Sequence, residues 1–204
     1  KKKKKLTNKI FEIADGVENI DSHNYDYDPK VENINNVNAQ EVKFGAKAGV
    51  NFASLSGDDA DGLDGRTSFH IGGVVNIGIS EKFAVQPELV YSSQGFTFSE
   101  SGVDVTGKLD YINLPVLADF TVANGFSIQA GPQVGFNITD KVEAEGESES
   151  LDAESIDFGA AFGAQYKMET GLFFQARYSL GFSEVIKDVD VKNNVISLSV
   201  GYMF

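Results

Sequence analysis

The chain has 204 residues, with 16 Phe, 21 Gly, no Cys, no Trp and a formal net charge of −13 at pH 7. The lack of Cys excludes disulfides, thiolate catalysis and Cys-ligated metal sites. The acidic balance argues against binding nucleic acid through its phosphates. No window approaches the roughly 18–20 apolar residues that a transmembrane helix needs. A membrane-spanning barrel stays possible, because its alternating strands are only mildly hydrophobic on average.

Residues 1–40 differ in composition from the rest of the chain. Lys1–Lys5 are followed by Asn- and Asp-rich sequence with little apolar periodicity, which is typical of a disordered or expression-derived polar extension. Alternatively, Lys1–Lys5 is the basic start of a signal peptide and Val37–Ala39 is its cleavage site, although the apolar segment between them is missing. We therefore expect a leader at 1–40 and a folded domain at 41–204.

From Val42 onward, apolar and polar residues alternate with a period of two, as in strands with one apolar face. In 196–204, for example, Ile, Leu, Val, Tyr and Phe alternate with Ser, Gly and Met. Gly95 interrupts the third strand and predicts a bulge there. The eight predicted strands are 42–52, 69–79, 83–91, 110–120, 126–138, 156–168, 172–182 and 194–204.

The connections alternate between long and short. Long loops are expected at 55–66, 99–108, 139–155 and 184–193, and tight turns at 80–82, 123–125 and 169–171, where Gly125 and Gly171 suit a turn. A meander with all its long loops at one end is the layout of an outer-membrane barrel, with short turns and both termini on the periplasmic side. The four loops carry a net charge of −11, so the acid gathers at one end.

The face opposite the apolar one distinguishes this barrel from a soluble, lipocalin-like barrel. A surface in water is normally about 25–35% charged, whereas this face is mostly Gly, Ser, Asn and Gln. Small and amide side chains suit the crowded interior of a narrow barrel. We therefore predict an all-β, eight-stranded antiparallel up-and-down transmembrane β-barrel.

Several segments carry a family resemblance: the first strand at 43–52, Gln86–Ser92, Tyr111–Val116, Gly131–Gly135 and the terminal Phe204. On these, residues 42–204 resemble the small outer-membrane β-barrels of Bacteroidota that are called porin-family or PorT-like. The resemblance implies the bacterial outer membrane, contact with outer-membrane lipid and lipopolysaccharide, and a C-terminal signal, Tyr202 and Phe204, for the barrel assembly machinery. The family's roles are diverse, so its label is no evidence of a pore.

The charged residues of the inner face form the first candidate site. We expect them to pair as a polar network that fills the lumen, because an unpaired buried charge is costly; a continuous ion path is the alternative. The seven residues are Lys43, Lys47, Glu88, Asp119, Asp157, Lys167 and Arg177.

Two weaker candidates remain. Asp59, Asp61 and Asp64 lie in a loop with the composition of a calcium site, but the closing Glu of an EF-hand is missing, and we expect no metal site. Ser68 and His70 share the inner face, yet no orienting carboxylate is evident. We therefore expect no enzyme and no cofactor.

The predicted function is that of a structural or accessory envelope protein. Such a barrel would contact protein partners through its wall and acidic loops. The alternatives are a narrow passive channel for small solutes or ions and a lipid-modifying enzyme.

Overall fold

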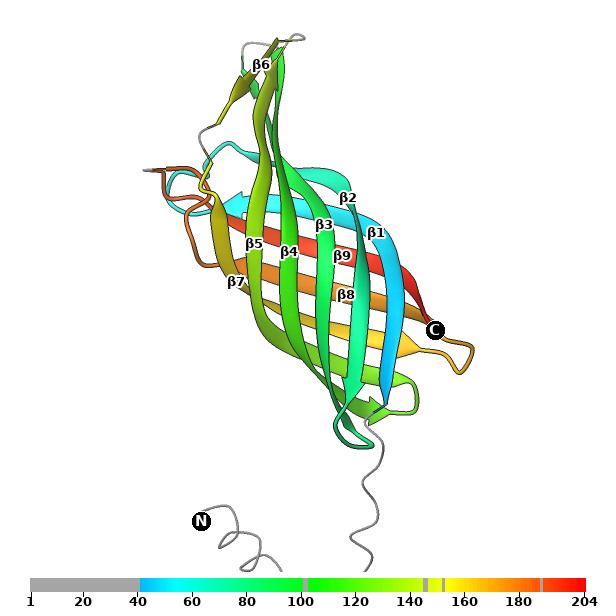
Figure 1. The fold of residues 1–204 in the computed structure, drawn as a ribbon. Helices are drawn as coiled ribbons and strands as arrows, with labels where there is room; N and C mark the ends of the chain where they lie inside the picture. The colour runs from blue at the N-terminus through cyan, green and yellow to red at the C-terminus, as the bar shows by residue number, and fades with distance from the viewer. Residues whose placement is uncertain (1–40, 101–102, 145–146, 152, 188) are drawn as a thin grey trace, which may run out of the picture. The chain divides into compact units, whose positions relative to one another are not determined.

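The computed structural model describes residues 41–204, apart from 101–102, 145–146, 152 and 188. The chain divides into two units, Lys1–Val37 and Asn38–Phe204, and the described residues belong to the second (Figure 1). The predicted leader at 1–40 lies outside them. Within the described part of the chain, no helix is long and apolar enough to cross a membrane.

Eight long strands form a closed antiparallel barrel. Neighbouring strands follow the order β4-β3-β2-β1-β9-β8-β7-β5, and the pairing of β4 with β5 closes the ring. The short β6 continues the sheet from β5 outside this ring. The predicted fold class is confirmed. The strands are β1 (Val42–Ser56), β2 (Asp64–Gly78), β3 (Phe83–Glu100), β4 (Val103–Ala123), β5 (Phe126–Ala144), β6 (Glu147–Ser150), β7 (Ile156–Lys167), β8 (Leu172–Gly181) and β9 (Lys192–Met203).

The tight turns lie where they were predicted, whereas two of the four predicted long loops are largely strand. Gly125 and Gly171 have positive φ values of 73° and 92° in their turns. The predicted loop at 99–108 is mostly strand, because β3 and β4 stay paired as far as Glu100 and Val103. Much of the predicted loop at 139–155 is likewise paired, in β5 and β6. We call the end with the tight turns the turn end and the opposite end the loop end, where β3, β4 and β5 project beyond the other strands (Figure 1).

The irregularity predicted at Gly95 is present. The pairing of β2 with β3 slips between Gly65 and His70, opposite this glycine, and Gly95 has a φ of 126°. The extra residue belongs to β2 rather than to β3. Because β3 itself has no extra residue, Phe96 keeps the inward position of Glu88 and Gln94, and it is buried.

The barrel is apolar outside and polar inside. Phe44, Phe69 and Phe158 are each more than half exposed, as the alternation predicted. Among the described residues, 18 polar or charged side chains are buried against 13 hydrophobic ones, which inverts the usual distribution in a water-soluble protein. This wall suits lipid on the outside, and the polar groups inside must find partners among themselves.

An apolar cluster lies inside the lumen near each end. At the loop end, Val185 and Val191 from the β8–β9 connection pack on Leu109 and Tyr111 of β4, and all four are at most 1% exposed. Toward the turn end, Val74, Phe173 and Met203 form the second cluster. We call these the outer and the inner apolar cluster. The polar core of the barrel lies between them.

Candidate functional site

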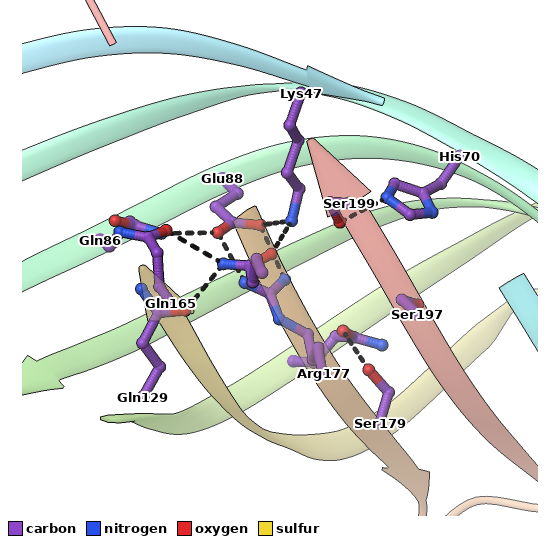
Figure 2. Close-up of polar contacts among 12 residues, drawn as sticks. Lys47, His70, Gln86, Glu88, Gln129, Gln165, Arg177, Ser179, Ser197 and Ser199 are labelled. Carbon is purple, nitrogen blue, oxygen red and sulfur yellow. Dashed lines mark hydrogen bonds and ion pairs between the residues drawn. The ribbon is translucent and has the colours of Figure 1, made fainter. Parts of the chain in front are cut away.

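At the centre of the lumen, the buried carboxylate of Glu88 forms ion pairs with the side chains of Lys47 and Arg177 (Figure 2). Arg177 of β8 donates from Nη1 and Nη2 to the two oxygens of Glu88 on β3, both at 2.7 Å. Lys47 of β1 lies with Nζ 2.7 Å from Glu88 Oε2. All three side chains are at most 6% exposed. Bidentate geometry of this kind is the strongest form of the arginine–carboxylate pair.

Amide side chains join this centre to a second carboxylate, Asp119 of β4. Lys47 Nζ donates to Gln175 Oε1 at 2.8 Å, and Gln175 Nε2 donates to Gln129 Oε1 at 2.7 Å. Gln129 Nε2 then donates to Asp119 Oδ2 at 2.9 Å. Each amide turns its oxygen toward the lysine and its nitrogen toward the aspartate. The two glutamines thus connect the ammonium of Lys47 to the carboxylate of Asp119 by hydrogen bonds that all run in the same direction.

The network returns to Glu88 along the other side of the lumen. Asn76 of β2 donates to Asp119 Oδ2 at 3.5 Å and to Gln86 Oε1 at 3.0 Å. Gln86 Nε2 donates to Glu88 Oε1 at 2.9 Å. A closed ring of seven side chains results, with Arg177 attached to it. We call these eight residues the lumen ring: Lys47, Asn76, Gln86, Glu88, Asp119, Gln129, Gln175 and Arg177.

The lumen ring is neutral when its four ionisable side chains carry their usual charges. Two cations balance two carboxylates, and amide groups donate to Glu88 Oε1 and Asp119 Oδ2. Such networks are seldom large net stabilisers, but removing one member leaves a buried charge without its partner. The ring takes side chains from β1, β2, β3, β4, β5 and β8, so it ties most of the barrel wall together.

Three of the seven predicted lumen charges lie outside this ring. Lys43 sits near the turn end and pairs with Glu41 at 3.0 Å. Lys167, with Asp119, lines an open cavity of about 220 Å³ at the turn end. Asp157 has only a long contact, 3.5 Å from Asn193 Nδ2, and its Oδ1 is buried without a partner among the described residues.

A second polar cluster surrounds His70, nearer the loop end. Asn51 Nδ2 donates to the carbonyl oxygens of Phe69 and Ser93, which fixes the orientation of its amide. Its Oδ1 lies 2.8 Å from His70 Nδ1, so Nδ1 carries the proton; Nε2, 2.8 Å from Ser199 Oγ, then accepts. The Ser68–His70 pair considered from the sequence is not formed, since Ser68 donates to the Ser93 carbonyl at 2.6 Å.

The order Ser199–His70–Asn51 is the hydrogen-bond order that activates a serine in hydrolases. Here all three side chains are at most 7% exposed. A cavity of about 20 Å³ beside them is lined by Asn51 and His70 but not by Ser199, and it holds about one water molecule. A substrate therefore has no path to the hydroxyl within the described structure.

The calcium candidates are not brought together as a site. Asp59 Oδ2 accepts from the backbone N–H of Asp190 at 2.9 Å. Across the described ranges, no group of three or more His, Asp or Glu side chains could hold a metal ion.

The acidic loop end has isolated ion pairs. Lys108 bonds the Glu143 carboxylate and holds its pKa below the usual value. The ammonium of Lys192, 2.8 Å from Asp190, lowers the pKa of Asp190 in the same way. Both pairs are partly exposed, and pairs in such contact with water contribute little to stability.

Sequence reasoning found the charged members of the lumen ring but missed its amides. Asn76, Gln86, Gln129 and Gln175 all occupy inward positions of predicted strands. The alternation would have found them had every inward amide been treated as a potential partner. It could not show which charges reach each other, because that depends on strand stagger around the ring.

Known proteins share this architecture. The crystal structure of Ail, the attachment invasion locus protein of Yersinia pestis, matches with a TM-score of 0.54 and 21% identity, over 80% of this chain and 99% of that one. Neisserial surface protein A matches with a TM-score of 0.61 and 17% identity, over 81% of this chain and 100% of that one. At these identities the likeness shows the fold alone. A search of curated protein sequences finds no match.

The family model for the outer membrane protein beta-barrel domain matches residues 38–187. That span covers most of the chain and seven of the eight barrel strands in whole. With the closed barrel and its inverted polarity, it assigns the protein to the bacterial outer membrane. The chain belongs to the outer membrane protein β-barrel domain family.

Proposed function

We propose that this protein is a non-conducting, non-enzymatic barrel that serves as a structural or accessory component of the cell envelope. The observation that supports this most is the filled lumen. The lumen ring crosses the barrel interior, and an apolar cluster lies on either side of it. A solute would have to break the ring and pass both clusters.

Breaking the ring is costly because its charged side chains are at most 6% exposed. Removing one partner of a buried ion pair costs about 3–5 kcal/mol. A passing ion would also have to displace Val185 and Val191, which are 1% exposed. The wall and the loop end are then the surfaces left for function.

The loop end is the surface that we propose for protein partners. At this end β5 and β6 carry Asp140, Glu143 and Glu149, and the predicted loops hold most of the chain's net negative charge. A partner with a basic surface fits this end. Ail of Yersinia pestis has been crystallised in complex with the heparin analogue sucrose octasulfate; a polyanion of that kind would be repelled here.

The finer family assignment is also part of the proposal. The segments named above favour the PorT-like, porin-family barrels of Bacteroidota, with outer-membrane lipid and lipopolysaccharide around the wall. We further propose that the barrel assembly machinery reads Tyr202 and Phe204. The rings of Tyr202 and Phe204 lie 5.8 Å apart at the end of the last strand, and Phe204 is 77% exposed.

Planar-bilayer recording on the full chain tests the closed lumen. We expect no steady conductance steps from the wild-type protein. Replacing both valines of the outer apolar cluster and Arg177 (Val185→Ser, Val191→Ser, Arg177→Ala) should produce steps in a protein that still folds. Regular large steps from wild type would overturn the proposal.

Affinity capture from mild detergent tests the partner surface. The full chain should retain an envelope protein that is lost when Asp140, Glu143 and Glu149 become Asn, Gln and Gln. The matched control is Glu81→Gln with Glu169→Gln, which removes charge at the turn end and should leave capture unchanged. Equal capture by both variants would refute the role of the loop end.

A narrow passive channel is the second candidate. The cavities of about 220 Å³ at the turn end and about 20 Å³ beside His70 favour it, since each leaves unfilled space inside the lumen. Wild-type conductance in the bilayer experiment would select this function.

A further inference from the structure

A small cavity on the far side of the lumen ring from Asp119 has an unusual lining. It has a volume of about 20 Å³, and its charged wall consists of Lys47 and Arg177, with no carboxylate among the lining residues. Hydroxyl and amide groups complete the wall, among them Ser197, Ser179 and Asn113. We infer that this cavity is a binding site for a small monovalent anion of about the size of chloride.

Unused donors at the cavity provide the first argument. Arg177 Nε is buried and has no hydrogen-bond partner among the described residues, although the side chain as a whole is 6% exposed. Lys47 offers three N–H donors, and the recorded bonds, to Glu88 and Gln175, account for two. Donors left unsatisfied in such a place cost about 1–3 kcal/mol each. An anion between them would satisfy both.

The arrangement of charge is the second argument. Glu88 serves both cations and lies on their other side, away from the cavity lining. The second carboxylate, Asp119, has no direct contact with Lys47 among the recorded bonds and reaches it through other members of the lumen ring. His70, which also lines the cavity, donates from Nδ1 and accepts at Nε2, and so adds no negative charge. The potential at the cavity is therefore positive even though the lumen ring as a whole is neutral.

Gln94 supports the same assignment. Its Oε1 is buried without a partner, while its Nε2 donates to Ser92 Oγ at 3.1 Å. Ser92 Oγ already accepts from Asn51, so its own proton is free to donate. A 180° turn of the Gln94 amide would let Oε1 accept that proton and Nε2 donate into the cavity. Bound anion and turned amide would together leave none of these groups unpaired.

The volume of the cavity limits its ligand to a small ion. A space of about 20 Å³ holds roughly one water-sized species. It excludes sulfate, phosphate and organic acids. The site is thus distinct from any surface that recruits partners, and its presence or absence leaves the proposed function untouched.

Unfolding of the full chain in detergent tests the site, with sodium chloride compared with sodium gluconate at equal ionic strength. This comparison cancels general screening. Chloride should raise the unfolding midpoint in a saturable way, as expected for a ligand of the folded state. Lys47→Met should weaken the apparent chloride affinity by about tenfold or more. Lys43→Met, on the same strand near the turn end, is the matched control and should leave it unchanged.

Two further measurements keep the inference falsifiable if Lys47→Met does not fold. Gln94→Glu places a carboxylate on the cavity wall and should abolish the chloride effect without removing a member of the lumen ring. Crystals soaked in bromide should show an anomalous peak between Lys47 Nζ and Arg177 Nε. No chloride-specific stabilisation of wild type, full retention of it in Gln94→Glu, or bromide only at the surface would each overturn the inference.

Discussion

Replacing Glu88 with Gln is the sharpest test of the lumen ring. The amide keeps the size of the side chain but removes the charge that Lys47 and Arg177 share. Each cation lies 2.7 Å from a Glu88 oxygen. At an effective dielectric constant of about 20, that distance corresponds to roughly 6 kcal/mol of attraction per pair. Because dehydrating the carboxylate offsets much of this attraction, we expect a net loss of about 3–5 kcal/mol in the free energy of unfolding.

Urea unfolding of the refolded barrel in lipid vesicles would measure this loss. The chain has no Trp, so far-ultraviolet circular dichroism is the suitable signal. Lys43→Met removes a half-exposed cation of the same strand and should change the free energy of unfolding by less than about 0.5 kcal/mol.

The triple variant Lys47→Met, Glu88→Leu, Arg177→Leu removes the charges together. It should recover most of the loss, because an apolar replacement of a whole buried cluster is often neutral or stabilising. If Glu88→Gln were as stable as wild type, or if the triple variant were less stable than Glu88→Gln, the reasoning would be refuted.

Two further substitutions test the packing and the wall. A Cβ on Gly201 would lie 2.2 Å from Phe173 Cζ, so Gly201→Ala should cost about 1–3 kcal/mol in the same assay; Gly73→Ala, whose nearest atom would be 4.0 Å away, should cost little. Leu198→Arg places a charge on the outer face beside Val50 and Ala176 and should cost about 2–4 kcal/mol in vesicles. Val42→Arg, at the turn end of β1, should cost under about 1 kcal/mol, and equal costs for these two arginines would contradict a lipid-facing wall.

The alternation of residues predicted the barrel well because one rule governs every strand. A side chain faces either outward or inward, and the period of two carries over from strand to strand. Asn113 to Phe120 shows this most clearly: the even-numbered residues, Leu114 to Phe120, are exposed, and the odd-numbered residues, Asn113 to Asp119, are buried.

The strand ends were harder to predict than the strands. Beyond the barrel wall no lipid imposes an apolar outer face, so the alternation weakens while the backbone pairing continues. Phe96 and Phe98 on β3 stack at 6.3 Å, in a hairpin whose partner strand includes Val105. Backbone pairing between neighbouring strands, rather than burial of side chains, extends β3, β4 and β5. The polar composition of these segments instead predicts loops.

The barrel interior contains bulky side chains that its overall composition did not predict. The inner face was expected to be small and polar, yet Tyr111, Leu117 and Phe173 point inward and are at most 1% exposed. These bulky groups take up the space that a lumen of small residues would leave to water. Because this space is filled, the four charges of the lumen ring are at most 6% exposed, although Asp119 lines the cavity at the turn end, and they need one another. The lumen ring and the two apolar clusters are thus parts of a single arrangement, in which the apolar groups limit the water in the interior and the amides supply the hydrogen bonds that four nearly buried charges need.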